Sequence, residues 1–195
     1  MTADRKAELI QIAIELVMKS GFDSFSYSDL ADQLGIRKAS IHHHFPKKED
    51  LGLAILEKVK EVCADHFDHI SQQNITAAKK LDLAFSQGRD LCESGNMICP
   101  IGSLQAEYNV IPTSMQNKLR EIEDLEIDFF TKVLDQGRRE ECFAFQGSPR
   151  DQAIFVVSTL KGGLQYARTH DKSTFTKVIN QLKRSLKPQA APALA

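Results

Sequence analysis

Apolar residues near the start of the chain recur every three or four positions. This spacing places them on one face of an α-helix, which is typical of a helix that packs against a core. The positions on this face are Leu9, Ile12, Ala13, Leu16 and Val17. Ser20 and Gly21 follow them, and glycine commonly closes the C-terminal end of a helix. The pattern therefore predicts a helix over residues 3–19.

Helical periodicity extends along the rest of the chain, and no run of alternating Val, Ile and Thr indicates a strand. The six prolines fit the starts of helices or the end of the chain. Further helices are predicted over residues 27–34, 38–44, 47–70, 75–93, 100–108, 112–140, 149–170 and 172–186. We therefore expect an all-α fold of about nine helices, with a flexible tail over residues 188–195.

Two short helices joined by a glycine turn are predicted near the N-terminus. Ser26 is followed three residues later by Asp29, which is a weak form of the capping box that begins a helix. Gly35 separates this helix from the next one, in which Ile41 provides the apolar side. Two short helices packed on a longer preceding helix form a helix-turn-helix, here over residues 26–45.

Charge is balanced over the whole chain but not in this motif. The 25 Lys and Arg residues against 26 Asp and Glu residues exclude a protein that coats nucleic acid through its total charge. Residues 33–48 nevertheless contain no acid and four cations, namely Arg37, Lys38, Lys47 and Lys48. Such cations neutralise phosphates, and the Ser40 hydroxyl and the imidazoles of residues 42–44 can donate to bases or to backbone oxygens. The segment therefore predicts a local DNA-binding surface.

Over residues 6–57 the chain closely resembles the TetR family of transcriptional regulators. The resemblance is carried by the pattern of the first helix, Gly21-Phe22, Ser26, the D-L-A run at 29–31, Gly35, the K-A-S-I run at 38–41 and the H-H-F-P-K-K-E block at 43–49. It implies an N-terminal three-helix DNA-binding domain over residues 3–63. It also implies a helical ligand-binding and dimerisation domain over residues 64–187.

This resemblance implies which residues bind DNA. The helix at residues 37–45 would enter the major groove, and the implied contacts are Ser26, Arg37, Lys38, Ser40, His42, His43 and Lys48. Relatives often carry tyrosine where this chain has His42. An imidazole reaches less far than a tyrosine hydroxyl, so the usual phosphate contact at this position is in doubt.

Aromatic and thiol side chains outside the motif are candidates for a ligand cavity, because such cavities are mostly apolar with few polar groups. They are Cys63, Phe67, Phe85, Cys92, Cys99, Tyr108, Phe129 and Phe130. The alternative is that most of them fill the core. Cys99 precedes Pro100 at a predicted helix start, where thiols are more reactive, and the stretch resembles TetR repressors that sense electrophiles or oxidants through a cysteine at this place. Alternatively, Cys99 is a small apolar residue packed under the helix.

Two adjacent glycines interrupt the predicted helix at residues 149–170. A glycine inside a helix costs about 1 kcal/mol relative to alanine, so close packing against another helix is expected there. In the TetR family the last two helices pair with those of a second subunit as a four-helix bundle. The resemblance therefore implies a homodimer whose interface includes Phe155, Gly162, Gly163 and Tyr166.

Other classes of protein are less consistent with the sequence. The motifs of common hydrolases, metalloproteases and nucleotide-binding enzymes are missing, so no enzyme and no cofactor is expected. Asp124, Glu126 and Asp128 are expected on the solvated face of a charged helix. Neighbouring residues on a helix point about 100° apart, so residues 42–44 cannot converge on a metal ion. Cys63, His66 and His69 share a helix face but lack a fourth ligand.

The cysteines and the lengths of the apolar runs indicate where the chain works. Its four cysteines are widely spaced, as expected for free thiols in a reducing cytosol, and no apolar run is long enough to span a bilayer. We therefore expect a cytoplasmic regulator, most often a repressor, that a small-molecule or electrophile inducer of unknown identity releases from a palindromic double-stranded operator. The alternative is a helical small-molecule-binding or adaptor protein without DNA binding, against which the basic segment argues.

Overall fold

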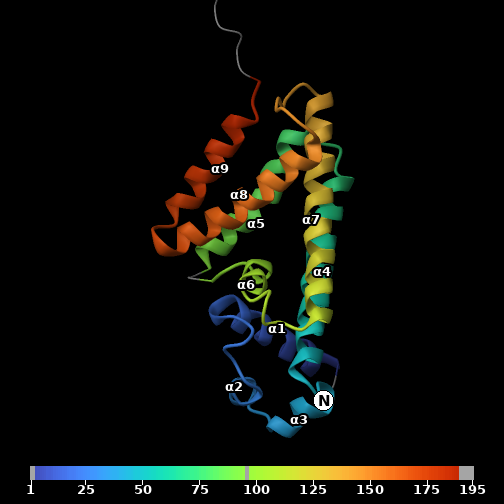
Figure 1. Ribbon diagram of the computed structural model, residues 1–195, viewed down its shortest axis with the longest axis vertical. Helices are drawn as coiled ribbons and strands as arrows, with labels where there is room; N and C mark the ends of the chain where they lie inside the picture. The colour runs from blue at the N-terminus through green and yellow to red at the C-terminus, as the bar shows by residue number, and fades with distance from the viewer. Residues whose placement is uncertain (1–2, 95–96, 189–195) are drawn as a thin grey trace, which may run out of the picture. The chain divides into compact units, whose positions relative to one another are not determined.

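The computed structural model describes residues 3–94 and 97–188 of the chain (Figure 1). Within these residues the secondary structure consists of nine α-helices without a strand, which confirms the predicted all-α fold. The helices are α1 (Ala3–Ser20), α2 (Tyr27–Leu34), α3 (Lys38–His44), α4 (Lys48–Gln72), α5 (Ala77–Glu93), α6 (Pro100–Ala106), α7 (Thr113–Arg139), α8 (Pro149–Thr169) and α9 (Ser173–Ser185). The tail predicted over residues 188–195 lies outside the described residues from position 189 onward.

The described residues form two compact units. The first unit contains residues 3–64 and 97–123, and the second contains residues 65–94 and 124–188. The helices α4 and α7 therefore each contribute residues to both units. The sequence assigns residues 97–123 to the ligand-binding part, whereas in the structure this segment packs with the N-terminal helices. Which part binds DNA and which binds a ligand stays a prediction.

The core of the first unit is built on the apolar face of α1. Leu9, Ala13 and Val17 are completely buried, as the helical spacing predicts. They pack with α2, α3, the first half of α4 and the residues of α6 in one continuous apolar cluster. In Figure 1, α1, α2 and α3 form the dark-blue to light-blue part of the chain. This cluster holds the two short helices of the predicted motif on a rigid base.

In the second unit, α9 packs against α5 and α8, and Phe175 of α9 lies at the contact with both. Phe175 of α9 is completely buried, and its ring lies where a side chain on Gly88 of α5 or on Gly163 of α8 would have to go. A Cβ atom at Gly163 would lie 3.3 Å from the Phe175 ring and 3.1 Å from Val178. Gly163 therefore serves close packing within the subunit.

Candidate functional site

The predicted helix-turn-helix begins with a complete capping box. The Ser26 hydroxyl accepts hydrogen bonds from the amides of Ser28 at 3.2 Å and Asp29 at 3.5 Å, and the Asp29 carboxylate accepts one from the Ser26 amide at 2.6 Å. The hydrogen bonds that the Ser26 amide and hydroxyl donate to the Asp29 carboxylate hold the pKa of Asp29 below its usual range. Gly35 closes α2 in the left-handed conformation at φ +62°. The predicted start and end of α2 are confirmed, and the cap is stronger than the sequence indicated.

The position of α3 is fixed by a buried tyrosine. The Tyr27 hydroxyl of α2 lies 2.9 Å from the carbonyl oxygen of Phe45 and 2.8 Å from that of Lys47, which follow the end of α3. Burial raises the pKa of Tyr27 to about 12, with the nearby Asp50 carboxylate adding to the effect. Ile41 and Phe45 turn into the core. Sequence reasoning missed Tyr27, since its partners lie some twenty positions away.

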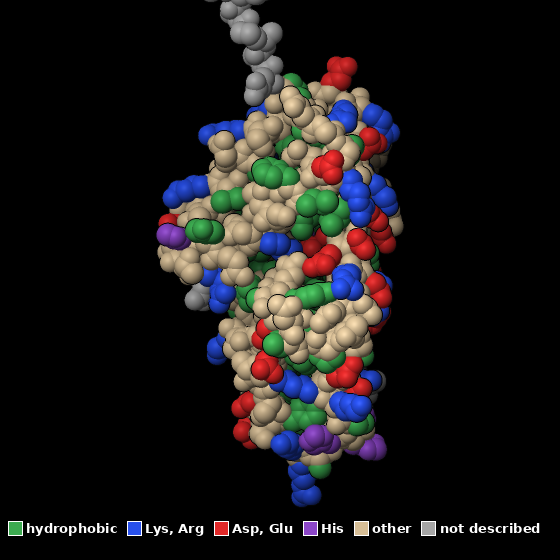
Figure 2. Space-filling model, viewed as in Figure 1, with side chains coloured by type: hydrophobic (Ala, Val, Ile, Leu, Met, Phe, Trp, Pro, Cys, Tyr) green, Lys and Arg blue, Asp and Glu red, His purple; other side chains and the backbone are tan. Residues whose placement is uncertain are grey.

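The opposite side of α3 faces solvent with cations and hydrogen-bond donors. The exposed residues are Arg37, Lys38, Ala39, Ser40, His42 and His43. Histidine side chains gather with those of lysine and arginine at the lower edge of Figure 2, where Figure 1 shows α3. Two acids follow the motif: the Glu49 carboxylate accepts a hydrogen bond from the Ser114 hydroxyl, and the Asp50 carboxylate accepts one from the Lys47 amide at 2.8 Å. The exposed side of α3 thus offers positive charge without a carboxylate of its own.

Lys48 differs from the other cations because it is held inside the first unit. Its ammonium donates to the Asp23 carbonyl at 3.2 Å and lies 4.9 Å and 4.8 Å from the ring centres of Phe22 and Phe25. Burial lowers the pKa of Lys48, and the acids Asp23 and Glu107 partly oppose this shift. The predicted phosphate contact of Lys48 would therefore compete with an internal network.

The turn between α1 and α2 is held by α6 and its neighbours. The Ile98 amide donates to the Met18 carbonyl, and the Ser103 hydroxyl donates to the Val17 carbonyl, both at 2.8 Å. The Glu107 carboxylate accepts hydrogen bonds from the Phe22 amide at 2.8 Å and the Asp23 amide at 3.2 Å. We call these contacts the α6 clasp. Neither Ser103 nor Glu107 gives a signal in the sequence.

Gly21 and Cys99 lie next to the clasp. Gly21 adopts φ +96°, and a Cβ atom there would collide with the Glu107 carboxylate, so the clasp requires glycine at this position. Cys99 is the N-cap residue of α6, is half-buried and packs against the core of the first unit. A change at the Cys99 sulfur is therefore positioned to disturb the start of α6.

The structure brings together four of the eight candidate ligand residues. Phe67, Phe85, Phe129 and Phe130 form one buried aromatic cluster in the second unit. The Phe67 and Phe129 rings stack at 4.3 Å between centres, and Phe130 meets Phe67 and Phe85 at 6.2 Å each. Cys92 belongs to the same unit and is half-buried, and burial raises the pKa of its thiol.

The other candidate ligand residues belong to the first unit. Cys63, Cys99 and Tyr108 are partly buried and pack against its apolar core. The Tyr108 ring also lies 5.5 Å from the Arg120 guanidinium. The structure thus distributes the candidate set over both units and joins only the phenylalanines.

The residues predicted for a dimer interface lie on α8 in two different settings. Phe155 and Tyr166 are exposed by 54% and 62%, and a Cβ atom on Gly162 would have no neighbour within 4 Å in the described chain. Ile154, which is not among the predicted interface residues, is also largely exposed. Gly163 is buried against α9 of the same subunit.

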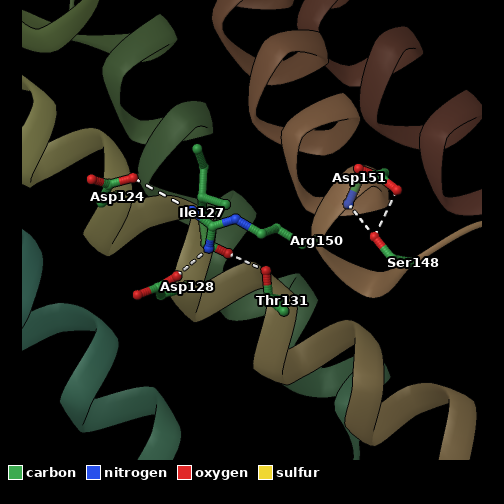
Figure 3. A network of polar contacts seen from close by, with 7 residues as sticks. All are labelled: Asp124, Ile127, Asp128, Thr131, Ser148, Arg150 and Asp151. Carbon is green, nitrogen blue, oxygen red and sulfur yellow. Dashed lines mark hydrogen bonds and ion pairs between the residues drawn. The ribbon is translucent and has the colours of Figure 1, made fainter.

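The acids of α7 do not all behave as predicted. Asp124 and Asp128 are solvated and pair with Arg150 of α8 at 3.5 Å and 2.6 Å, next to the Ser148–Asp151 cap (Figure 3). The prediction of a solvated position is wrong for Glu126, which is only 8% exposed and pairs with Lys161 of α8 at 2.8 Å. Glu126 points inward because it shares the buried side of α7 with Phe129 and Phe130.

The described residues also bear on metal binding and on membrane insertion. Within residues 3–94 and 97–188, no three His, Cys, Asp or Glu side chains form a group that could hold a metal ion. His66 is partly buried, which lowers its pKa, as does the neighbouring His69. Among the helices that the structure describes, none combines the length and apolar character required to cross a membrane.

Comparison with known proteins points to one family. The sequence model described as "Bacterial regulatory proteins, tetR family" matches residues 9–55. The HTH-type transcriptional repressor NemR of Escherichia coli K12 is 25% identical over 194 residues, which cover 98% of this chain and 96% of NemR. A TetR family regulator structure from Agrobacterium tumefaciens matches with a TM-score of 0.91 at 24% identity, covering 95% of this chain and 98% of that one. A TetR regulator structure from Legionella pneumophila matches at 0.82 and 28% identity, covering 95% and 99%.

Proposed function

Since this chain belongs to the TetR family of bacterial regulatory proteins, we propose that it is a ligand-responsive transcriptional repressor that binds operator DNA as a homodimer. One observation carries the proposal. The exposed side of α3 presents cations and donors without a carboxylate, on a helix that Tyr27 holds in place within the family match. The similar protein NemR is itself named a transcriptional repressor.

In this proposal each subunit inserts α3 into the major groove of one half-site. Two-fold related helices read half-sites about one DNA turn apart, roughly 34 Å, and so require a palindromic operator. Lys38, Ser40, His42 and His43 would contact bases or phosphates, and Arg37 would add charge at the start of the helix. Ser26 and Lys48 would contact the backbone from its edges. The exposed apolar side of α8 would join the two subunits.

The inducer would act by binding more tightly to the conformation with low affinity for DNA than to the conformation with high affinity. Coupling of about 1–3 kcal/mol changes operator affinity by roughly five- to 150-fold, and DNA opposes the inducer by the same factor. A small apolar or aromatic inducer suits the cluster of Phe67, Phe85, Phe129 and Phe130. An electrophile could instead react at Cys99, because its sulfur lies at the start of the α6 clasp.

The decisive experiment is a binding titration with the DNA upstream of the protein's own coding sequence. We expect a retarded complex that N-ethylmaleimide dissociates if Cys99 is the sensor. Cys99→Ser should then keep its DNA affinity and lose the response, whereas Cys142→Ser, which changes a half-buried thiol in the other unit, should respond like the parent protein. Release of DNA from Cys99→Ser at the same dose would exclude this cysteine. Absence of release from both proteins would favour a non-covalent inducer.

The same titration separates the proposal from a helical binding protein that has lost its DNA function. Such a protein would leave its upstream DNA free at every concentration, while still changing its melting temperature with small apolar compounds. That result, with the protein shown to be folded and dimeric, would contradict the proposed repressor.

A further inference from the structure

The solvent-facing side of α3 carries two exposed histidines beside its cations. His42 and His43 are exposed, and Lys38 precedes His42 by one helical turn, so both side chains lie on the same face. The third histidine, His44, is half-buried, and its ring lies edge-on to the His43 ring with 5.1 Å between the ring centres. Residues 33–48 contain no acid, so the imidazoles have no carboxylate of their own segment to pair with.

Within residues 3–94 and 97–188, neither imidazole contacts a carboxylate of the elements packed against α3. From α2, the Tyr27 ring faces His42 at 4.7 Å, and its hydroxyl stays neutral because burial raises the pKa of Tyr27 to about 12. From α1, Lys6 brings a further positive charge toward His44 and Phe45. Between α3 and α4, Lys47 is exposed. In the first turn of α4, the Glu49 carboxylate accepts a hydrogen bond from the Ser114 hydroxyl and the Asp50 carboxylate accepts one from the Lys47 amide. Of the two acids of α2, Asp29 is held in the capping box and Asp32 is exposed to solvent.

Histidine is the side chain whose charge changes between pH 5 and pH 8, and an unperturbed imidazole is mostly neutral at pH 8. A DNA backbone brings a dense row of negative charge to any surface that docks on it. Phosphates therefore favour the protonated imidazole in the complex, whereas in the free protein no carboxylate of the described residues contacts His42 or His43. Binding and proton uptake must then promote each other.

We propose that DNA binding by this chain is linked to proton uptake on His42 and His43, so that its affinity for DNA increases as the pH falls. The inference rests on the proposed DNA-binding function and adds a regulation of the same surface. His44 contributes less, because desolvation lowers its pKa and the charge of Lys6 acts in the same direction. At low pH the two exposed histidines act as further phosphate-binding cations beside Lys38.

The linkage can be measured without knowing the operator, because the phosphate contribution to binding is independent of sequence. The probe is a fluorescent duplex of mixed sequence, about 30 base pairs long, at about 50 mM salt. We expect the full-length protein to bind it about tenfold more tightly at pH 6 than at pH 8, at constant ionic strength. The dependence of affinity on salt should also be steeper at pH 6, because more cations then replace counterions.

Two double variants isolate the histidines. His42→Gln together with His43→Gln should reduce the ratio of affinities at pH 6 and pH 8 to about twofold or less. His42→Lys together with His43→Lys should bind tightly at both pH values, because its charges no longer titrate in this range. His69→Gln is the matched control, since it removes an exposed histidine of α4 outside the motif and should keep the full ratio. Melting curves at both pH values check that every protein is folded.

Equal affinity of the parent protein at pH 6 and pH 8 would overturn the inference and leave the repressor proposal intact. A full pH ratio in the double glutamine variant would also overturn it, because the protons would then bind elsewhere. Failure to bind the protein's upstream DNA, with tighter binding of the mixed duplex at pH 6, would contradict only the repressor. A folded protein that binds neither DNA at either pH would contradict both.

Discussion

The exposed sides of α3 and α8 show how differently two helices of one chain can face solvent. The α3 side presents Lys38, Ser40 and His42, whose charges and hydrogen-bonding groups are well solvated. The α8 side presents Phe155 and Tyr166, and apolar surface left in water costs about 25 cal/mol for each Å². A polar surface can stay free until a polyanion arrives, whereas an apolar surface of this kind favours a permanent cover. The difference agrees with the proposal that α3 binds DNA and that α8 binds a second subunit.

The largest expected effect comes from charging the α8 side. In Phe155→Asp, a carboxylate would have to be buried against the second subunit, so we expect the dimer to dissociate. Loss of the linked second α3 should weaken operator binding by about a hundredfold or more. Sedimentation and DNA titration measure the two effects. Val110→Asp is the control, since Val110 is 71% exposed in the other unit and its replacement should change neither quantity.

The two adjacent glycines of α8 distinguish packing within the subunit from packing between subunits. Gly163→Leu would force a side chain against Phe175 and Val178, so we expect the folded subunit to lose about 1–3 kcal/mol of stability. Gly162→Leu meets open space in the subunit and should weaken the dimer instead, without lowering the stability of the monomer. Denaturant unfolding over a range of protein concentrations separates the two cases. Equal destabilisation by both variants would contradict this division.

The same contrast explains how far the sequence could be read. Helix periodicity, Ser26 with Asp29 and the turn at Gly35 specify α1 to α3 through neighbours a few positions apart, and these predictions are confirmed. Glu107 and Glu126 could not be placed, because their roles depend on contacts with residues 35 to 85 positions away. For the same reason Gly162 and Gly163 looked equivalent in the sequence. Their difference arises only when α9 packs on one side of α8.

The exposed side of α3 depends on a buried hydrogen bond that holds the helix in place, and removing the Tyr27 hydroxyl tests this. Tyr27→Phe removes the single O–H donor that two carbonyls near the end of α3 share, so we expect a loss of about 1–2 kcal/mol in the free energy of unfolding. The raised pKa of Tyr27 also predicts how the stability of the fold changes with pH. Tyr27 stabilises the fold below about pH 10, and this contribution is lost as the pH rises toward about 12.

The pH dependence provides the control for this variant. Tyr27→Phe should lose less stability than the parent protein between about pH 10 and pH 12, because it has no hydroxyl to ionise there. A parallel decline in Tyr27→Phe and the parent protein would show that another group controls the alkaline loss.

The smallest expected effects distinguish Lys38, an exposed cation of α3, from Lys48, which is held inside the first unit. Lys38→Ala should weaken binding to every DNA sequence by about 1 kcal/mol and lower the salt dependence by about one phosphate contact, with the melting temperature unchanged. Lys48→Ala should cause the same loss in binding and also lower the melting temperature by a few degrees, since it removes the hydrogen bond to Asp23 and the cation that lies over Phe22 and Phe25. An unchanged salt dependence in Lys48→Ala, beside a lowered melting temperature, would assign Lys48 to the fold alone. In that case the cationic surface that reads DNA would end with α3, and Lys48 would serve it only by holding the turn between α1 and α2.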